Sequence, residues 1–317
     1  MNLIPLHSNR LIELVDLWNK ELKNVFPMRQ ELFNQNSFLD ENICHKGSRL
    51  AINKEGNVIG FITVKYYQEQ LEVGIPRSIG WIQSLLVDSN YRNNGVGTQL
   101  LHHAEAILKE KNIKHVILGR DPWHYFPGIP SYDSATCKWF EKRGYHSEGT
   151  EHDMICSYAN SEIVQFPNKE DVTFSILHKS EKIELIAFLH RCFPGRWEYE
   201  ARHYFRKGGT GREFVVLKKG NQIIGFCRIN DEQSPLIAQN VYWSPLFAES
   251  LGGIGPLGVD ASQRKNGYGL AIVQAAIAFL RKRGIQRIVI DWTGLVSFYN
   301  KLGYTIWKSY ESYKKEL

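Results

Sequence analysis

Hydrophobic positions along the chain alternate between a helical period and a strand period, and polar turns or glycines separate the segments. In the first half this pattern predicts strands at Asn2–Leu6, Ser48–Asn53, Val58–Lys65, Ile79–Val87 and His115–Leu118, with further strands near His152–Tyr158. It predicts helices at Leu11–Trp18, Met28–Phe38, Val96–Lys111 and Ala135–Arg143. Residues 119–130 hold three prolines and several aromatic side chains, so we expect an ordered loop there.

The second half repeats this order. It predicts strands at Thr173–Leu177, Glu213–Lys218, Gln222–Ile229, Leu257–Val259 and Arg287–Ile290, and helices at Glu181–Cys192, Trp197–Arg206, Tyr268–Arg283 and Val296–Lys301. Phe-Pro occurs at Phe26 and again at Phe193, and Gly-Tyr occurs at Gly144 and again at Gly303. We infer an internal duplication of an α/β unit. The predicted domains are residues 1–160 and 166–317.

A glycine loop stands between a buried strand and a helix in both halves. Each copy reads Arg-x-x-Gly-x-Gly, starting at Arg92 in the first half and at Arg264 in the second. Such a loop gathers unpaired N–H groups at the positive end of a helix dipole, which favours a bound phosphate. Two copies in the same strand–loop–helix setting make a chance match improbable.

The charge distribution agrees with an anionic ligand for the second half. Residues 1–160 hold 17 basic and 18 acidic side chains, whereas residues 161–317 hold 22 and 15. The basic residues are dispersed, so we expect a small polyanion rather than nucleic acid as the partner. No apolar run approaches the roughly 18 residues of a membrane helix. The five cysteines form no C-x-x-C pair, so we expect a cytoplasmic protein with no metal site.

Two other nucleotide-binding loops are excluded by the residues after the glycines. A Walker A loop requires Gly-Lys-Ser/Thr, but Gly97 precedes Thr98 and Gly269 precedes Leu270. A dinucleotide fingerprint requires a third glycine, and the corresponding positions are Leu100 and Ile272.

The order of elements around each loop resembles the GNAT acetyltransferase superfamily over nearly the whole length of both halves. The resemblance implies an α/β (α+β) fold of two tandem domains, each with a mixed, mostly antiparallel twisted sheet flanked by helices. It also implies that the loop amides hold the pyrophosphate of acetyl-CoA while the preceding strand meets the pantetheine arm and the acetyl carbonyl. The implied cofactor-binding residues are Leu257, Gly258, Val259, Arg264, Lys265, Asn266, Gly267, Tyr268, Gly269 and Leu270, and Leu85, Leu86, Val87, Arg92, Asn93, Asn94, Gly95, Val96, Gly97 and Thr98.

The two halves differ at the short helix before the last Gly-Tyr. In this family a tyrosine there often protonates the departing thiolate; the second half has Tyr299, whereas the first half has Phe140. A phenol is a suitable proton donor to a thiolate and a phenyl ring is not. We therefore predict chemistry in the C-terminal half.

The general base stays open at this point. Neither Ile79–Val87 nor Gly252–Val259 contains an acid, and the candidates in the second half are Asp291 and Glu198, with a water relay as the alternative. In the first half, His124 in the loop after His115–Leu118 is a further catalytic candidate, and an ordered structural loop is the other interpretation.

The prediction is an acetyl-CoA-dependent N-acetyltransferase in which a small-molecule amine attacks the thioester directly. We expect no nucleic acid and no membrane partner, and a monomer or homodimer. The alternative is a non-catalytic acyl-CoA-binding regulatory or structural protein. The Fem-type aminoacyl transferases share a duplicated fold of this kind, but the two intact glycine loops count against them.

Overall fold

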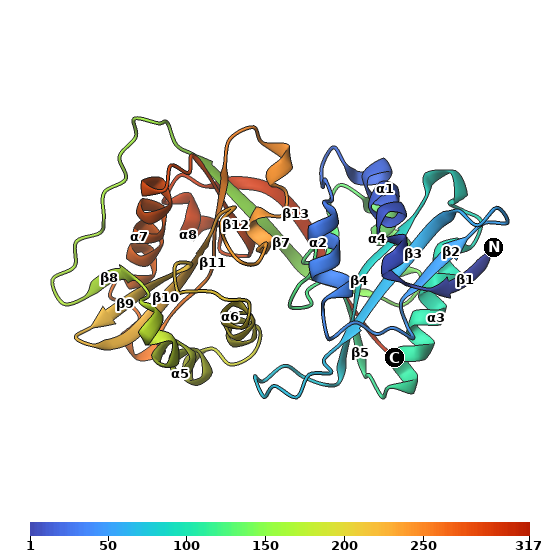
Figure 1. The fold of residues 1–317 in the computed structure, drawn as a ribbon, viewed down its shortest axis with the longest axis horizontal. Helices are drawn as coiled ribbons and strands as arrows, with labels where there is room; N and C mark the ends of the chain where they lie inside the picture. The colour runs from blue at the N-terminus through green and yellow to red at the C-terminus, as the bar shows by residue number, and fades with distance from the viewer. The chain divides into compact units, whose positions relative to one another are not determined.

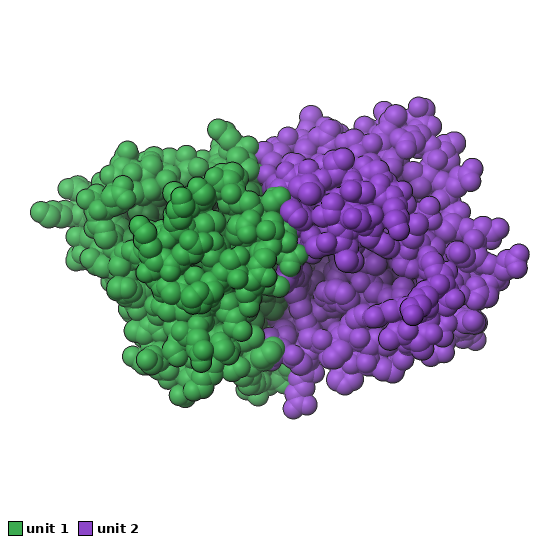
Figure 2. All heavy atoms as spheres, turned by 180° about the vertical axis from the view of Figure 1, so that it is seen from behind, with its two compact units in different colours: residues 1–71, 76–151, 309–317 green, residues 72–75, 152–308 purple.

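The computed structural model describes residues 1–317, which divide into two compact units. Unit 1 comprises residues 1–71, 76–151 and 309–317, and unit 2 comprises residues 72–75 and 152–308 (Figure 2). No helix is long and apolar enough to cross a membrane.

Unit 1 is a sheet with helices on both faces (Figure 1). Its strands are β1 (Asn2–Pro5), β2 (Arg49–Ile52), β3 (Val58–Tyr66), β4 (Ile79–Val87), β5 (His115–Leu118) and β6 (Ile129–Pro130). Its helices are α1 (Leu11–Leu22), α2 (Gln30–Phe33), which continues as the π-helical turn η2 (Asn34–Phe38), α3 (Val96–Glu110) and α4 (Ser134–Glu141), with the 3₁₀ turn η3 (Ser89–Tyr91) before α3. Strands β1 to β4 pair antiparallel in sequence order, and β4 pairs parallel with β5.

Unit 2 repeats this arrangement. Its strands are β8 (Thr173–Ile176), β9 (Phe214–Lys219), β10 (Gln222–Asn230), β11 (Leu251–Val259) and β12 (Arg287–Thr293). Its helices are α5 (Lys182–Cys192), α6 (Arg196–Arg206), α7 (Tyr268–Lys282) and α8 (Val296–Asn300), with short turns η5 (Gln239–Val241), η6 (Ser244–Leu246) and η7 (Ala261–Gln263). Strands β8 to β11 pair antiparallel, and β11 pairs parallel with β12.

The last strand of each sequence half belongs to the unit built mainly from the other half. Strand β7 (His146–Ser157) ends the first half, and its residues 152–157 pair with β12 of unit 2. Strand β13 (Thr305–Glu316) ends the second half, and Lys314–Glu316 pair with β5 of unit 1. The predicted domains, residues 1–160 and 166–317, follow the sequence repeat, whereas the compact units exchange parts of these two strands.

Most predicted elements are present within one or two residues, although α1 and β12 end later than predicted and β7 begins at His146 rather than near His152. Two further differences concern β11 and β13. The pattern predicted only Leu257–Val259 as a strand, but β11 begins at Leu251 because the glycine-rich stretch before Leu257 also pairs with β10. Strand β13 was not predicted at all, because its polar side chains give no strong alternation.

The parallel strands of each unit are paired over only part of their length. In unit 2 the register runs from Leu251 opposite Arg287 to Ile254 opposite Ile290, and β11 continues without a partner on that edge. In unit 1 the register ends at Ile82 opposite Leu118. Each glycine loop therefore follows a strand whose last residues have one unpaired edge.

Candidate active site

The two glycine loops have the same backbone conformation. Gly95 and Gly267 are the N-cap residues of α3 and α7, with φ of 79° and 73°. Two residues earlier, Asn93 and Lys265 also adopt positive φ, at 63° and 69°. Glycine reaches this region without steric cost, so the glycine at each N-cap is required by the turn.

Each loop presents a row of unused amide donors. The N–H groups of residues 93–98 and of residues 265–270 donate to no other group of the chain. The next amides, of Gln99 and Ala271, donate to the carbonyls of Gly95 and Gly267 and begin the helical ladder. Six unpaired donors at a helix N-terminus, in each unit, have the arrangement that favours a bound anion.

The arginine of each loop is fixed by the strand that precedes it. Arg92 Nε donates to the Val87 carbonyl at 3.0 Å, and Arg264 Nε donates to the Val259 carbonyl at 3.3 Å. Because alternate residues of a strand face the same edge, Leu85 and Leu257 also direct their N–H and C=O groups to the unpaired edge. The predicted strand segments and loops thus lie together in each unit.

The loops differ in their electrostatics. In unit 1, Arg92 Nη2 forms an ion pair with Glu21 Oε2 at 2.5 Å. In unit 2, the guanidinium of Arg264 is exposed and has no carboxylate partner. Lys265 adds a second cation, and a Cβ placed on Gly267 would lie 3.5 Å from the Lys169 ammonium. The loop of unit 2 therefore carries two cations, Arg264 and Lys265, and Lys169 lies beside it as a third.

The strand ends beyond the paired segment also differ. In unit 1, Gln83 follows the last paired residue, and its side-chain amide donates to the carbonyls of Asn36 and Trp123 at 2.9 Å each. In unit 2, the residue that follows Ile254 is Gly255, which has no side chain to make such a bridge. A Cβ on Gly255 would lie 3.3 Å from Asp291 Oδ1, so the glycine leaves room beside that carboxyl group.

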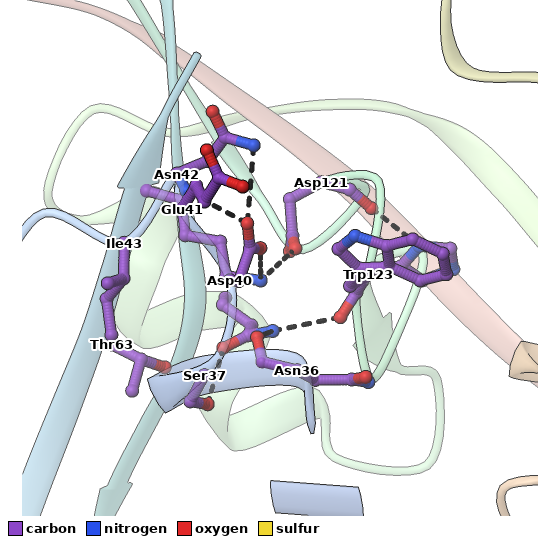
Figure 3. Close-up of polar contacts among 12 residues, drawn as sticks. Asn36, Ser37, Asp40, Glu41, Asn42, Ile43, Thr63, Asp121 and Trp123 are labelled. Atoms are coloured by element: carbon purple, nitrogen blue, oxygen red, sulfur yellow. Dashed lines mark hydrogen bonds and ion pairs between the residues drawn. The ribbon is translucent and has the colours of Figure 1, made fainter. Parts of the chain in front are cut away.

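A buried ion cluster occupies unit 1 next to Gln83. Lys65 Nζ lies 2.7 Å from both Asp40 Oδ2 and Asp121 Oδ2, and all three side chains are fully buried. Figure 3 shows Asp40 and Asp121 approaching each other from separate segments, with Trp123 and Asn36 beside them. Burial raises the pKa of Asp121; burial alone lowers the pKa of Lys65, but the two aspartates more than reverse that effect. This cluster fills the interior of unit 1.

Tyr299 and Phe140 occupy matching positions on α8 and α4. Each side chain is 5% exposed, and each packs edge-on against the tyrosine of the following Gly-Tyr, Tyr304 or Tyr145. The Tyr299 hydroxyl makes no hydrogen bond to the chain. Burial, with smaller contributions from Cys227 and Asp291, raises the pKa of Tyr299, which keeps the phenol protonated at neutral pH.

Asp291 lies on β12, one residue beyond the paired segment. Its Oδ1 accepts a hydrogen bond from the Asn240 side-chain amide at 2.9 Å, and the residue as a whole is partly buried. Burial raises the pKa of Asp291, although the nearby charge of Arg196 and the Asn240 hydrogen bond oppose that rise. A carboxyl group with a raised pKa is suited to proton transfer near neutral pH.

The other two predicted acid–base residues are held differently. Glu198 on α6 is fully buried and accepts from His190 Nδ1 at 3.1 Å and from Arg202 at 2.7 Å. His124 of unit 1 is 2% exposed, and its Nδ1 lies 2.9 Å from the Asp121 carbonyl. His124 belongs to the loop of residues 119–130, most of which are buried.

Sequence reasoning missed the residues between β10 and β11. Residues 231–250 fold over β11 and β12 through η5 and η6, and they bring Asn240 and Gln239 to the interior. The signal that could have found them is length, since the corresponding connection in unit 1, between β3 and β4, is shorter.

The duplicated fold, with an anion-binding loop in each copy, is that of a tandem acyltransferase. A model of the Acetyltransferase (GNAT) family matches residues 11–133 and again residues 183–304. The chain therefore belongs to the GNAT acetyltransferase family and carries two copies of its domain.

Individual relatives resemble either part of the chain or its fold. An uncharacterised N-acetyltransferase of Methanocaldococcus jannaschii is 27% identical over 131 residues, which are 39% of this chain and 57% of that protein. A glucosamine N-acetyltransferase region of a fungal multi-domain β-N-acetylglucosaminidase covers 99% of this chain at a TM-score of 0.87 and 24% identity, and the match spans 38% of that chain. A tandem GNAT protein from the clavulanic acid biosynthesis pathway matches 99% of this chain and 98% of its own at a TM-score of 0.70 and 12% identity.

Proposed function

We propose that the chain transfers the acetyl group of acetyl-CoA to a small-molecule amine, and that unit 2 performs the chemistry. One observation carries the assignment to unit 2: Arg264 has no counter-ion, whereas Arg92 is paired with Glu21. A pyrophosphate competes with Glu21 for Arg92 in unit 1 but meets an unopposed guanidinium in unit 2. Gly255 in place of Gln83, and Tyr299 in place of Phe140, support the same choice.

The residues of unit 2 fit the cofactor. The six amides of residues 265–270 and the cations of Lys169, Arg264 and Lys265 suit a pyrophosphate. The unpaired edge at Leu257 suits the amide groups of a pantetheine arm, which pairs with a strand edge as a peptide does. Acetyl-CoA, when bound, supplies the thioester acyl group and a thiolate leaving group.

The chain's own groups account for the proton transfers. Asp291 accepts a proton from the acceptor's ammonium or from the attacking amine, because its raised pKa matches that task. The Leu257 N–H on the unpaired edge stabilises negative charge on the acyl oxygen. Tyr299 donates its phenolic proton to the departing sulfur. Loss of the carboxyl or the phenol is expected to lower kcat by roughly 10² to 10⁴.

The test is turnover by the purified chain with acetyl-CoA and a panel of amines, read as thiol release and as acetylated product by mass spectrometry. D-glucosamine belongs in the panel because a protein of this fold is described as a glucosamine N-acetyltransferase region. Turnover that disappears in Asp291→Asn supports the proposal. Binding of acetyl-CoA with no turnover of any amine would instead support a non-catalytic acyl-CoA-binding protein.

A further inference from the structure

The carboxylates of unit 2 around α6 and β10 are almost all paired with arginine. Glu198 accepts from Arg202, Glu200 from Arg196, Glu213 from Arg212, and Asp231 from Arg212 and Arg283. Asp291 is the exception, because it accepts a hydrogen bond from the Asn240 side-chain amide and forms no ion pair. Asp291 is therefore the carboxylate of this group that can pair with a cation from outside the chain.

Asn240 orients that carboxylate. Its side-chain amide donates to Asp291 Oδ1 at 2.9 Å and lies 3.4 Å from the Gly255 carbonyl, while its own Oδ1 accepts from the Asn230 amide at 3.1 Å. Asn230 and Asn240 are both buried, and the hydrogen bonds run in one direction, from Asn230 to Asn240 and from Asn240 to Asp291. One carboxylate oxygen is thereby occupied by a neutral donor.

Glu200 explains why the nearest cation does not pair with Asp291. Arg196 lies close enough to Asp291 for its charge to affect the carboxyl, but its Nε donates to Glu200 Oε1 at 2.5 Å. Its guanidinium carbon also lies 4.4 Å from the centre of the Trp292 ring. Arg228 and Gln239 donate to Glu200 as well, at 3.4 Å and 3.3 Å, and hold that carboxylate in place. The charged groups that face Asp291 are thus Arg196 and Glu200 from α6, with the Tyr299 phenol from α8.

We infer that Asn240 and Glu200 are positioning residues: Asn240 holds the Asp291 carboxylate, and Glu200 keeps Arg196 away from it, so that Asp291 receives an acceptor with one cationic amine. The inference rests on the proposed function. A polyamine needs several unpaired carboxylates, and this site offers one. The acceptor class is therefore a small molecule with a single cationic amine.

The test compares Asn240→Ala and Glu200→Gln in the full chain, with Glu232→Gln as the control for loss of an exposed glutamate charge. Removing the Asn240 donor raises the pKa of Asp291 and moves the acidic limb of the kcat/KM profile to higher pH. Removing the Glu200 charge frees Arg196 to pair with Asp291, which lowers that pKa and moves the limb to lower pH. Both variants are expected to lose roughly 10- to 100-fold in kcat at the wild-type optimum, and Glu232→Gln is expected to match the wild type.

A carboxyl ¹³C NMR titration of labelled aspartate reads the same shifts without turnover, on variants whose circular dichroism shows a native fold. Shifts of opposite sign support the inference, and equal losses with an unmoved carboxyl titration overturn it. A spermidine preference over monoamines in the wild type also overturns it. If the wild type acetylates no amine, the proposed function fails, and the NMR titration still decides the roles of Asn240 and Glu200.

Discussion

Glu21 Oε2 lies 2.5 Å from Arg92 Nη2, so helix α1 supplies a counter-ion to the glycine loop of unit 1. In both units the first helix, α1 or α5, carries a cation that pairs with the aspartate at the N-cap of the 3₁₀ turn before the glycine loop. These pairs are Lys20 with Asp88 and Arg191 with Asp260. The next residue is Glu21 in unit 1 but Cys192 in unit 2. The residue at this one position therefore decides whether a carboxylate lies beside the arginine of the glycine loop.

Cys192→Glu is expected to weaken CoA binding by about 3- to 10-fold, because a carboxylate beside the loop of unit 2 competes for Arg264. Isothermal titration calorimetry measures the change, and higher salt should shrink it. Cys192→Gln introduces a side chain of about the same volume as glutamate but without the charge, and this variant should bind CoA as the wild type does. Equal losses in both variants would mean that packing, not charge, is responsible.

Tyr299→Phe is expected to lower kcat about 100-fold with little change in KM for acetyl-CoA, because the proton donor is lost while the ring still packs. Steady-state thiol release measures both constants. The matched variant Phe140→Tyr should leave kcat unchanged. Full activity of Tyr299→Phe, together with a loss in His124→Ala, would place the chemistry in unit 1 instead.

Lys65→Met is expected to destabilise unit 1 by about 3–5 kcal/mol, because two buried aspartates lose their only cation. Urea unfolding followed by tryptophan fluorescence measures the loss. The triple variant Lys65→Met/Asp40→Asn/Asp121→Asn removes all three charges and should recover most of the stability. If it is as unstable as the single variant, packing rather than charge explains the effect.

Asp260→Asn is expected to lower stability at neutral pH by about 1 kcal/mol and to have less effect in acid. Hydrogen bonds from Ser262, and then the Arg191 ion pair, hold the pKa of Asp260 well below its usual range. A depressed carboxyl pKa contributes stability above the unfolded value near 3.8, and that contribution is lost as the pH falls below it. Urea unfolding of both proteins at several pH values tests this; a difference that stays constant down to pH ~2 would contradict the assignment.

The sequence predicted the features that depend on local pattern. The strand before each loop, the glycines at positive φ and the helix after them all lie within about 20 residues, so their periodicity and turn residues are readable directly. The contrast between Tyr299 and Phe140 was also visible, because the repeat aligns them.

The features that depend on distant pairing could not be predicted. Arg92 and Glu21 are 71 residues apart, and nothing in either segment reports their ion pair. Asn240 lies in the β10–β11 connection, which is longer than the corresponding β3–β4 connection of the first half, so the repeat gave no matching position for it. The exchange of β7 and β13 depends on which strand edge each of them pairs with. The residues of β7 and β13 do not by themselves specify the partner edge, so the exchange could not be predicted from local sequence.

The strand exchange also sets an order of assembly during synthesis. The edge of β5 in unit 1 is completed by residues 314–316, which follow the whole of unit 2 in the sequence. Unit 2 needs residues 152–157, which precede nearly all of its own sequence. Most of unit 1 is therefore synthesised before unit 2, but its sheet is completed only after residues 314–316 have been made, and until then the edge of β5 is open to pairing with other nascent chains.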